Sequence, residues 1–196
     1  MEKKKMNLPN KLTILRLILI PFYIFFLMTD FFSFSWLVAF VIFICACLTD
    51  TFDGKIARKR NLITNFGKFA DPLADKILVV SAMVCFVYLH RMPFWVCIII
   101  LAREFAVSGF RLVAATNGRV LAASWWGKIK TVCQMITCIM MTCNIERLVT
   151  DYGFPPAFYT VWHIVELVAM YAALALTVIS MIDYFYKNKD TFTTKE

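Results

Sequence analysis

Long apolar runs separated by short polar segments form the dominant pattern of this chain. An α-helix needs about 20 apolar residues to cross the hydrocarbon core of a membrane. Six runs approach that length, and the polar residues between them fall at their ends. The pattern therefore predicts six membrane-spanning helices, over residues Leu12–Met28, Ser35–Arg58, Asp71–Leu89, Pro93–Ala115, Gly127–Val149 and Ala157–Tyr186.

No stretch shows the strict alternation of apolar and polar residues that a membrane β-strand requires. Only helices or closed barrels cross a bilayer, because every backbone polar group must be paired there. With 61% hydrophobic residues, the composition is also far from that of a soluble domain. We therefore expect an all-α polytopic membrane protein, with one membrane domain over residues 1–196.

Basic residues gather at alternate ends of the predicted spans, and this asymmetry predicts the orientation. Lys and Arg are enriched in cytoplasmic loops of membrane proteins. The basic segments are Lys3, Lys4, Lys5 and Lys11; Lys55, Arg58, Lys59, Arg60 and Lys68; Arg119, Lys128 and Lys130; Lys187 and Lys189. Both termini are therefore expected in the cytoplasm. The net charge of +8 indicates contact with anionic lipids and anionic substrates; nucleic acid is not expected, because the basic residues are spread along the membrane edge.

Four aspartates flank the basic connection between the second and third predicted spans. Asp50 and Asp53 are three residues apart, and Asp71 and Asp75 are four apart, so each pair shares a helix face. Ionised carboxylates at the edge of a membrane are costly unless they are neutralised. Since no His or Cys lies among them, they suit hard divalent cations such as Mg²⁺ or Mn²⁺ rather than Zn²⁺.

The alternative is that the aspartates only cap helices. Asp71 precedes Pro72, so it could be an N-cap with proline at the first helical position. That interpretation accounts for one aspartate of the four.

Small residues and one arginine continue the aspartate segment. Gly54 and Ala57 follow Asp53 at helical spacing, and Gly67 lies beyond the basic connection. Exposed backbone beside carboxylates lets a bulky polar group approach closely, and Arg58 can bind phosphate charge. Together these features indicate a pyrophosphate group as the ligand.

Residues 50–75 match the pattern D-x2-D-G-x2-A-R-x8-G-x3-D-x3-D at every fixed position. In this pattern and spacing the chain resembles the CDP-alcohol phosphotransferases. The remaining sequence is similar to one branch, the bacterial phosphatidylglycerophosphate synthases, in the segments "NLPNKLTILR", "REFAVSGFR" and "AASWWGKIKTVCQM". Phe110 departs from that branch, which more often has leucine there.

The resemblance implies a six-helix membrane enzyme, homodimeric, in the bacterial cytoplasmic membrane, with its active site open to the cytosol. By position, Asp50, Asp53, Asp71 and Asp75 would bind the metal ions, and Asp75 would also be the catalytic base. The residues that would shape the CDP-diacylglycerol site, beside Asp50, Asp53 and Asp71, are Gly54, Ala57, Arg58 and Gly67. Two metal ions would then clamp the pyrophosphate while CMP leaves.

Cationic side chains near the cytosolic ends of the fourth and fifth spans indicate where an anionic acceptor binds. Arg111, Lys128 and Lys130 combine a guanidinium with ammonium groups, which suits a phosphomonoester such as sn-glycerol 3-phosphate. Arg103 lies deeper, beside Glu104, and is predicted either to join this site or to form a structural ion pair. Asn10 and Arg16, at the start of the first span, are at the same level and can contribute.

The predicted activity is transfer of a phosphatidyl group from CDP-diacylglycerol to sn-glycerol 3-phosphate, with release of CMP. Within the same family, the acceptor could instead be inositol phosphate, serine or phosphatidylglycerol, the last as in cardiolipin synthesis. A divalent-cation transporter is a different class that also places acids in membrane helices. Against transport, the four aspartates lie at one edge, beside glycines and phosphate-binding bases.

Overall fold

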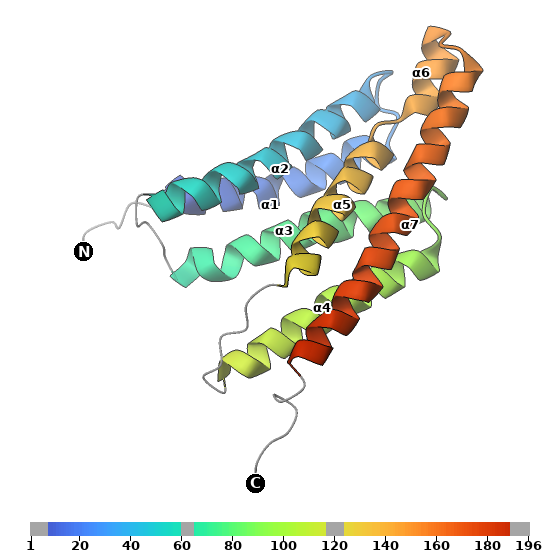
Figure 1. The fold of residues 1–196 in the computed structure, drawn as a ribbon. Coiled ribbons are helices and arrows are strands. Elements are labelled where there is room, and N and C mark those ends of the chain that lie inside the picture. The colour runs from blue at the N-terminus through green and yellow to red at the C-terminus, as the bar shows by residue number, and fades with distance from the viewer. Residues whose placement is uncertain (1–7, 60–64, 117–123, 189–196) are drawn as a thin grey trace, which may run out of the picture. The chain divides into compact units, whose positions relative to one another are not determined.

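The computed structural model describes the backbone of residues 8–59, 65–116 and 124–188, and the side chains within these ranges except those of residues 8–9, 50–59, 65–69 and 151. The described ranges contain helices and no strand, which confirms the all-α class (Figure 1). The helices are α1 (Leu8–Met28), α2 (Ser35–Lys59), α3 (Asn65–Tyr88), α4 (Phe94–Thr116), α5 (Trp125–Thr142), α6 (Ile145–Tyr152) and α7 (Pro156–Lys187).

Two helix boundaries differ from the predicted spans. Helix α3 begins at Asn65, so Asp71 lies inside it and Pro72 is an internal proline. The N-cap interpretation of Asp71 is therefore wrong. The predicted fifth span is divided, because α5 ends at Thr142 and α6 starts at Ile145. Thr142, Cys143 and Asn144 at this break are poor helix formers.

Three stretches in the described ranges are long and apolar enough to cross a membrane. They are Asn10–Met28, Trp125–Thr150 and Pro156–Lys187, and α2 adds a shorter apolar stretch, Ser35–Thr49. In α3 and α4, charged residues interrupt the apolar sequence: Asp71, Asp75, Lys76, Arg103, Glu104 and Arg111. Apolar helices suited to a membrane are thus confirmed, whereas the count of six spans stays a prediction.

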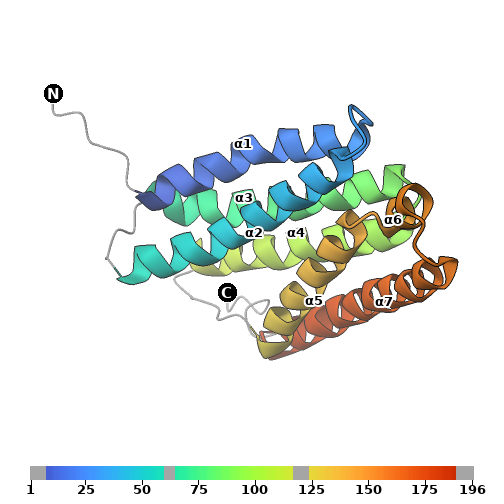
Figure 2. The ribbon, with the colours of Figure 1, turned by 90° about the horizontal axis from the view of Figure 1, so that it is seen from above.

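The chain divides into two compact units. The first comprises residues 1–89 and 141–144, and the second comprises residues 90–140 and 145–196. In the first unit, α1 packs along both α2 and α3, and the three helices lie side by side in two perpendicular views (Figures 1 and 2).

Small residues let the helices of the first unit approach closely. Buried alanines recur along one face of α3, at Ala70, Ala74 and Ala82. Small residues at helix interfaces are typical of membrane bundles, where close backbone approach replaces hydrophobic association. A large buried residue of α1, Tyr23, also packs in this unit: its ring lies 5.2 Å from that of Phe43, and its hydroxyl is 3.1 Å from Thr142 Oγ1.

In the second unit, α7 packs against both α4 and α6. The turn that joins α6 to α7 requires a glycine, since Gly153 has a φ of +71° and its N–H donates to the Val149 carbonyl. An ion pair fixes the start of the unit to α7, with Arg91 Nη2 3.6 Å from the buried carboxylate of Glu166. These contacts position α4 and α7 side by side.

Candidate active site

The backbone places the four aspartates on two consecutive helix ends. Asp50 and Asp53 lie in the last turns of α2, and Asp71 and Asp75 lie in the first turns of α3. Both helices pack on α1. The side chains of Asp50, Asp53, Gly54, Ala57, Arg58 and Gly67 lie outside the described residues, so their roles stay predictions.

Asp71 and Asp75 are partly exposed, while Ala74 between them is buried. The two carboxylates thus occupy a face of α3 that is not filled by apolar packing. Thr13 of α1, which is fully buried, donates a hydrogen bond from its Oγ1 to Asp71 Oδ1. Carboxylates that bind metal ions in proteins are commonly oriented by hydrogen bonds of this kind.

A stripe of buried polar residues on α1 faces the other helices of the first unit. It consists of Asn10, Thr13 and Arg16, which are 8%, 0% and 0% exposed. Their spacing of three residues places them on one face. Asn10 and Arg16 were predicted from the sequence, whereas Thr13 was not; its only signal was its position midway between them.

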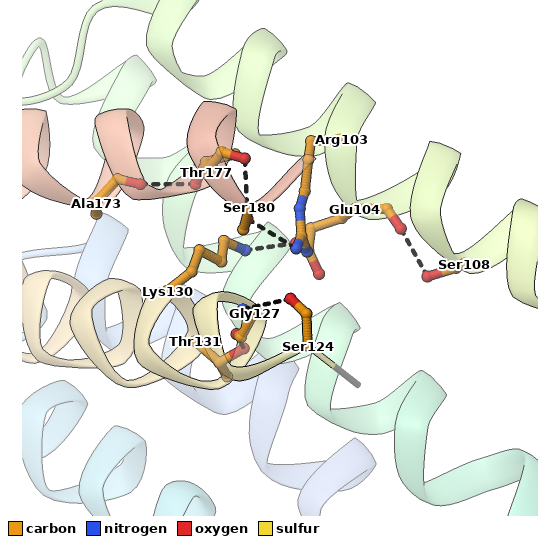
Figure 3. Close-up of polar contacts among 10 residues, drawn as sticks. All are labelled: Arg103, Glu104, Ser108, Ser124, Gly127, Lys130, Thr131, Ala173, Thr177 and Ser180. Carbon is orange, nitrogen blue, oxygen red and sulfur yellow. Dashed lines mark hydrogen bonds and ion pairs between the residues drawn. The ribbon is translucent and has the colours of Figure 1, made fainter. Parts of the chain in front are cut away.

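The second cluster of charges lies in the second unit and joins α4 to α5. Glu104 accepts a hydrogen bond from Arg103 Nη1 at 2.7 Å, and the same oxygen, Oε1, accepts one from Lys130 Nζ. Figure 3 shows the three side chains converging. Arg103 and Lys130 are only 8% and 1% exposed. One carboxylate is therefore shared by two buried cations, and the triad carries a net charge of about +1.

Helix α7 holds the other side of Arg103. Ser180 Oγ accepts a hydrogen bond from Arg103 Nη2 at 2.9 Å and donates one to the Thr177 carbonyl at 3.0 Å (Figure 3). The guanidinium is thus fixed in a plane between a carboxylate of its own helix and a hydroxyl of α7. An arginine held in this way is pre-organised, so it loses little side-chain entropy when a further acceptor binds.

The first turn of α5 is ordered beside this arginine. Ser124 Oγ accepts the Gly127 N–H at 3.1 Å, which caps the start of the helix. A Cβ added at Gly127 would lie 3.7 Å from Arg103 Nη2, an ordinary contact distance. Glycine here is therefore not required by crowding.

The four residues predicted to bind the acceptor divide into two kinds. Arg103 and Lys130 are buried and paired with Glu104, so the predicted structural ion pair is present. Arg111 and Lys128 are exposed, and each cation lies over an aromatic ring. The Arg111 guanidinium carbon is 5.4 Å from the ring centroid of Tyr184, and Lys128 Nζ is 5.6 Å from that of Trp125.

Comparison with known proteins identifies the family. The family model described as CDP-alcohol phosphatidyltransferase matches residues 6–179, which include both clusters. The chain belongs to the CDP-alcohol phosphatidyltransferase family. This confirms the resemblance that the aspartate pattern indicated.

Several relatives carry the name CDP-diacylglycerol–glycerol-3-phosphate 3-phosphatidyltransferase, and three of them illustrate the similarity. The protein of Bacillus subtilis is 38% identical over 203 residues, with 96% of this chain and 98% of the relative covered. That of Haemophilus influenzae is 37% identical over 185 residues, with 92% of each chain covered. That of Sodalis glossinidius is 34% identical over 189 residues, with 93% and 94% covered. The similarity of this chain to these three relatives therefore extends along nearly its whole length.

Because the Glu104 carboxylate is shared by two buried cations, its removal should greatly lower the free energy of unfolding. Glu104→Ala leaves Lys130 and Arg103 without their acid, and breaking a buried pair from one side costs about 3 kcal/mol. We expect a clear fall in the thermal unfolding temperature, measured in detergent. Lys187→Ala is the matched control, because Lys187 pairs with Asp183 at the surface and such pairs contribute about 1 kcal/mol or less. Equal effects of the two substitutions would contradict the buried triad.

Proposed function

We propose that this protein transfers the phosphatidyl group of CDP-diacylglycerol to sn-glycerol 3-phosphate, giving phosphatidylglycerophosphate and CMP. The observation that carries the proposal is the similarity, along nearly the full length, to relatives whose names specify this reaction. The acidic residues of α2 and α3 and the basic residues of α4 and α5 suit its two substrates. Acidic residues suit a metal-bound pyrophosphate, and basic residues suit a phosphomonoester.

The donor site would be built around the aspartates. Asp50, Asp53, Asp71 and Asp75 would hold divalent ions, Mg²⁺ or Mn²⁺, and two ions would suit four carboxylates. The bond from Thr13 to Asp71 supports this assignment, since it orients an oxygen ligand rather than capping a helix. When bound, the metal supplies positive charge against the pyrophosphate. Gly54, Ala57, Arg58 and Gly67 would shape the nucleotide site.

Asp75 would act as the general base of the transfer. Its carboxylate accepts the proton of an acceptor hydroxyl, and the hydroxyl oxygen attacks the phosphorus of the phosphatidyl group. The new P–O bond forms as the P–O bond to CMP breaks, and the electron pair of the broken bond stays on CMP. The diacylglycerol portion can remain in the bilayer throughout.

The acceptor phosphate would bind to the cations of α4 and α5. Arg103 and Lys130 share one carboxylate, so an excess positive charge remains inside a membrane helix bundle, where an anion would balance it. Arg111 and Lys128 are exposed and would complete the contacts. A phosphomonoester carries nearly two negative charges and three acceptor oxygens, so it can accept hydrogen bonds from several of these cationic side chains at once.

The protein is proposed to act as one membrane domain over residues 1–196, with six spans and both termini in the cytoplasm. The family match spans residues of both compact units, which supports a single functional domain. The alternation of basic segments supports the orientation, and the relatives named above support a bacterial cytoplasmic membrane. A homodimer is proposed from the family resemblance alone.

A reconstitution experiment tests the reaction. Purified protein is given CDP-diacylglycerol, Mg²⁺ or Mn²⁺, and one acceptor from a panel of sn-glycerol 3-phosphate, inositol phosphate, serine, phosphatidylglycerol and glycerol. We expect phosphatidylglycerophosphate and CMP with glycerol 3-phosphate only, and none after chelation of the metal. Preference for another acceptor would leave only the family chemistry, and cation flux into liposomes without CMP release would favour a transporter.

Substitution of the proposed base should nearly abolish turnover. Asn at position 75 keeps the shape of the side chain but accepts no proton, so Asp75→Asn should lower kcat by about 10²–10⁴-fold or more. The measurement is CMP release at saturating substrates, with the unfolding temperature as a check on folding. Asp30→Asn, in the exposed turn between α1 and α2, is the control and should retain activity. A variant at position 75 with half the parent rate would exclude this residue as the base.

Arg111 should matter for the acceptor and not for the donor. Arg111→Ala should raise the KM for glycerol 3-phosphate by about 10-fold or more, about 1.4 kcal/mol, with little change in the KM for CDP-diacylglycerol. Arg111→Lys, which keeps the charge without the bidentate fork, should be intermediate. Arg147→Ala, on α6, is the matched control. An unchanged acceptor KM in Arg111→Ala would remove this residue from the site.

A further inference from the structure

Tyr184 on α7 is a buried phenol whose hydroxyl has no hydrogen-bond partner among the residues that the structure describes. The residue is 2% exposed. A buried hydroxyl without a partner is destabilising, because it has lost its hydrogen bonds to water and gained none. The comparison within this chain is Tyr23, which is also buried, at 0% exposed, and whose hydroxyl is paired with Thr142 Oγ1.

The ring of Tyr184 is held in place by two consecutive residues of α4. Phe110 packs edge-on against it, with the ring centroids 5.8 Å apart and an interplanar angle of 84°. The Arg111 guanidinium lies over the ring, 5.4 Å from its centroid. The hydroxyl is therefore carried on a fixed support beside an exposed cation. The ring that carries the hydroxyl is thus in contact with Arg111, the residue that is also predicted to bind the acceptor phosphate.

The polar neighbours of Tyr184 on this face of α7 include a serine that accepts a hydrogen bond from a second arginine. Ser180 precedes Tyr184 by one helical turn on the same face of α7, and it holds Arg103 Nη2 at 2.9 Å. Arg103 Nε is also buried and has no hydrogen-bond partner in the described part of the chain. Donors without acceptors, between two arginines, indicate a ligand rich in acceptor oxygens.

We propose that the Tyr184 hydroxyl is an acceptor-binding group that donates a hydrogen bond to the phosphate of sn-glycerol 3-phosphate, next to Arg111. The proposal rests on the proposed function for the identity of the ligand. It deepens that function, since it adds a neutral donor from α7 to the basic residues of α4 and α5. The phosphate would supply the partner that the hydroxyl lacks within the described protein.

Tyr184→Phe tests this directly, because it removes only the hydroxyl and keeps the ring that Phe110 and Arg111 contact. Loss of a hydrogen bond to a charged phosphate should raise the KM for glycerol 3-phosphate by about 10-fold or more. The KM for CDP-diacylglycerol should not change. The thermal unfolding temperature without substrate should stay the same or rise, since a buried group without a partner has been removed.

Tyr23→Phe is the matched control, since it removes a buried hydroxyl that has an internal partner. It should show the opposite pattern, with a lower unfolding temperature and an unchanged KM for glycerol 3-phosphate. If Tyr184→Phe instead behaves like Tyr23→Phe, the hydroxyl is satisfied within the folded protein and the proposal is wrong. A rise in the KM for CDP-diacylglycerol alone would assign the hydroxyl to the donor and would also overturn it.

A binding measurement separates this proposal from the proposed function. The parent protein and Tyr184→Phe are heated in detergent with sn-glycerol 3-phosphate, inorganic phosphate or glycerol, without CDP-diacylglycerol. We expect both phosphates to stabilise the parent, the effect to be weaker in Tyr184→Phe, and glycerol to have none. If the parent gives no transfer to glycerol 3-phosphate yet shows this pattern, the function fails while the phosphate site stands. Equal stabilisation of parent and variant overturns the site.

Discussion

Charge inside a membrane helix bundle must be compensated by other groups of the protein or by a ligand, and this constraint organises much of the structure. A charged side chain without a partner costs several kcal/mol in such surroundings. In the second unit, Glu104 accepts hydrogen bonds from both Arg103 and Lys130, and Ser180 accepts one from Arg103 Nη2. These bonds tie α4 to α5 and to α7. The residues that make the unit polar are thus the same ones that hold its helices together.

The same constraint separates structural charges from those available to a ligand. Arg91 and Glu166 balance each other one to one, so this pair needs nothing further. The triad of Arg103, Glu104 and Lys130 does not balance, since two cations share one acid. In the first unit, Asp71 is met by a neutral hydroxyl from Thr13, which orients the carboxylate and leaves its charge in place. Among the described side chains, the triad is thus basic, whereas Asp71 and Asp75 place acidic charge on α3.

Much of this could be predicted from the sequence, because the helices follow apolar runs of membrane length and the aspartates fall at fixed helical spacing. The start of α3 could not, since Pro72 is a strong signal for a first turn, whereas the helix begins earlier, at Asn65. The burial of Lys130 was also hidden, because local sequence places a lysine at a cytosolic edge, whereas its partner Glu104 is 26 residues away on α4. Thr13 and Tyr184 gave no chemical signal of their own.

Tyr184 shows why such residues are found only in the structure. In sequence it is one aromatic among many on an apolar helix, and aromatic residues near the ends of spans usually mark the membrane interface. Its burial and the arginine over its ring are properties of the packed α4–α7 pair, and among the described residues its hydroxyl has no hydrogen-bond partner. A phenylalanine would pack equally well there and would leave no donor without a partner. Retaining the hydroxyl at a cost in stability is understandable when the group serves a substrate rather than the fold.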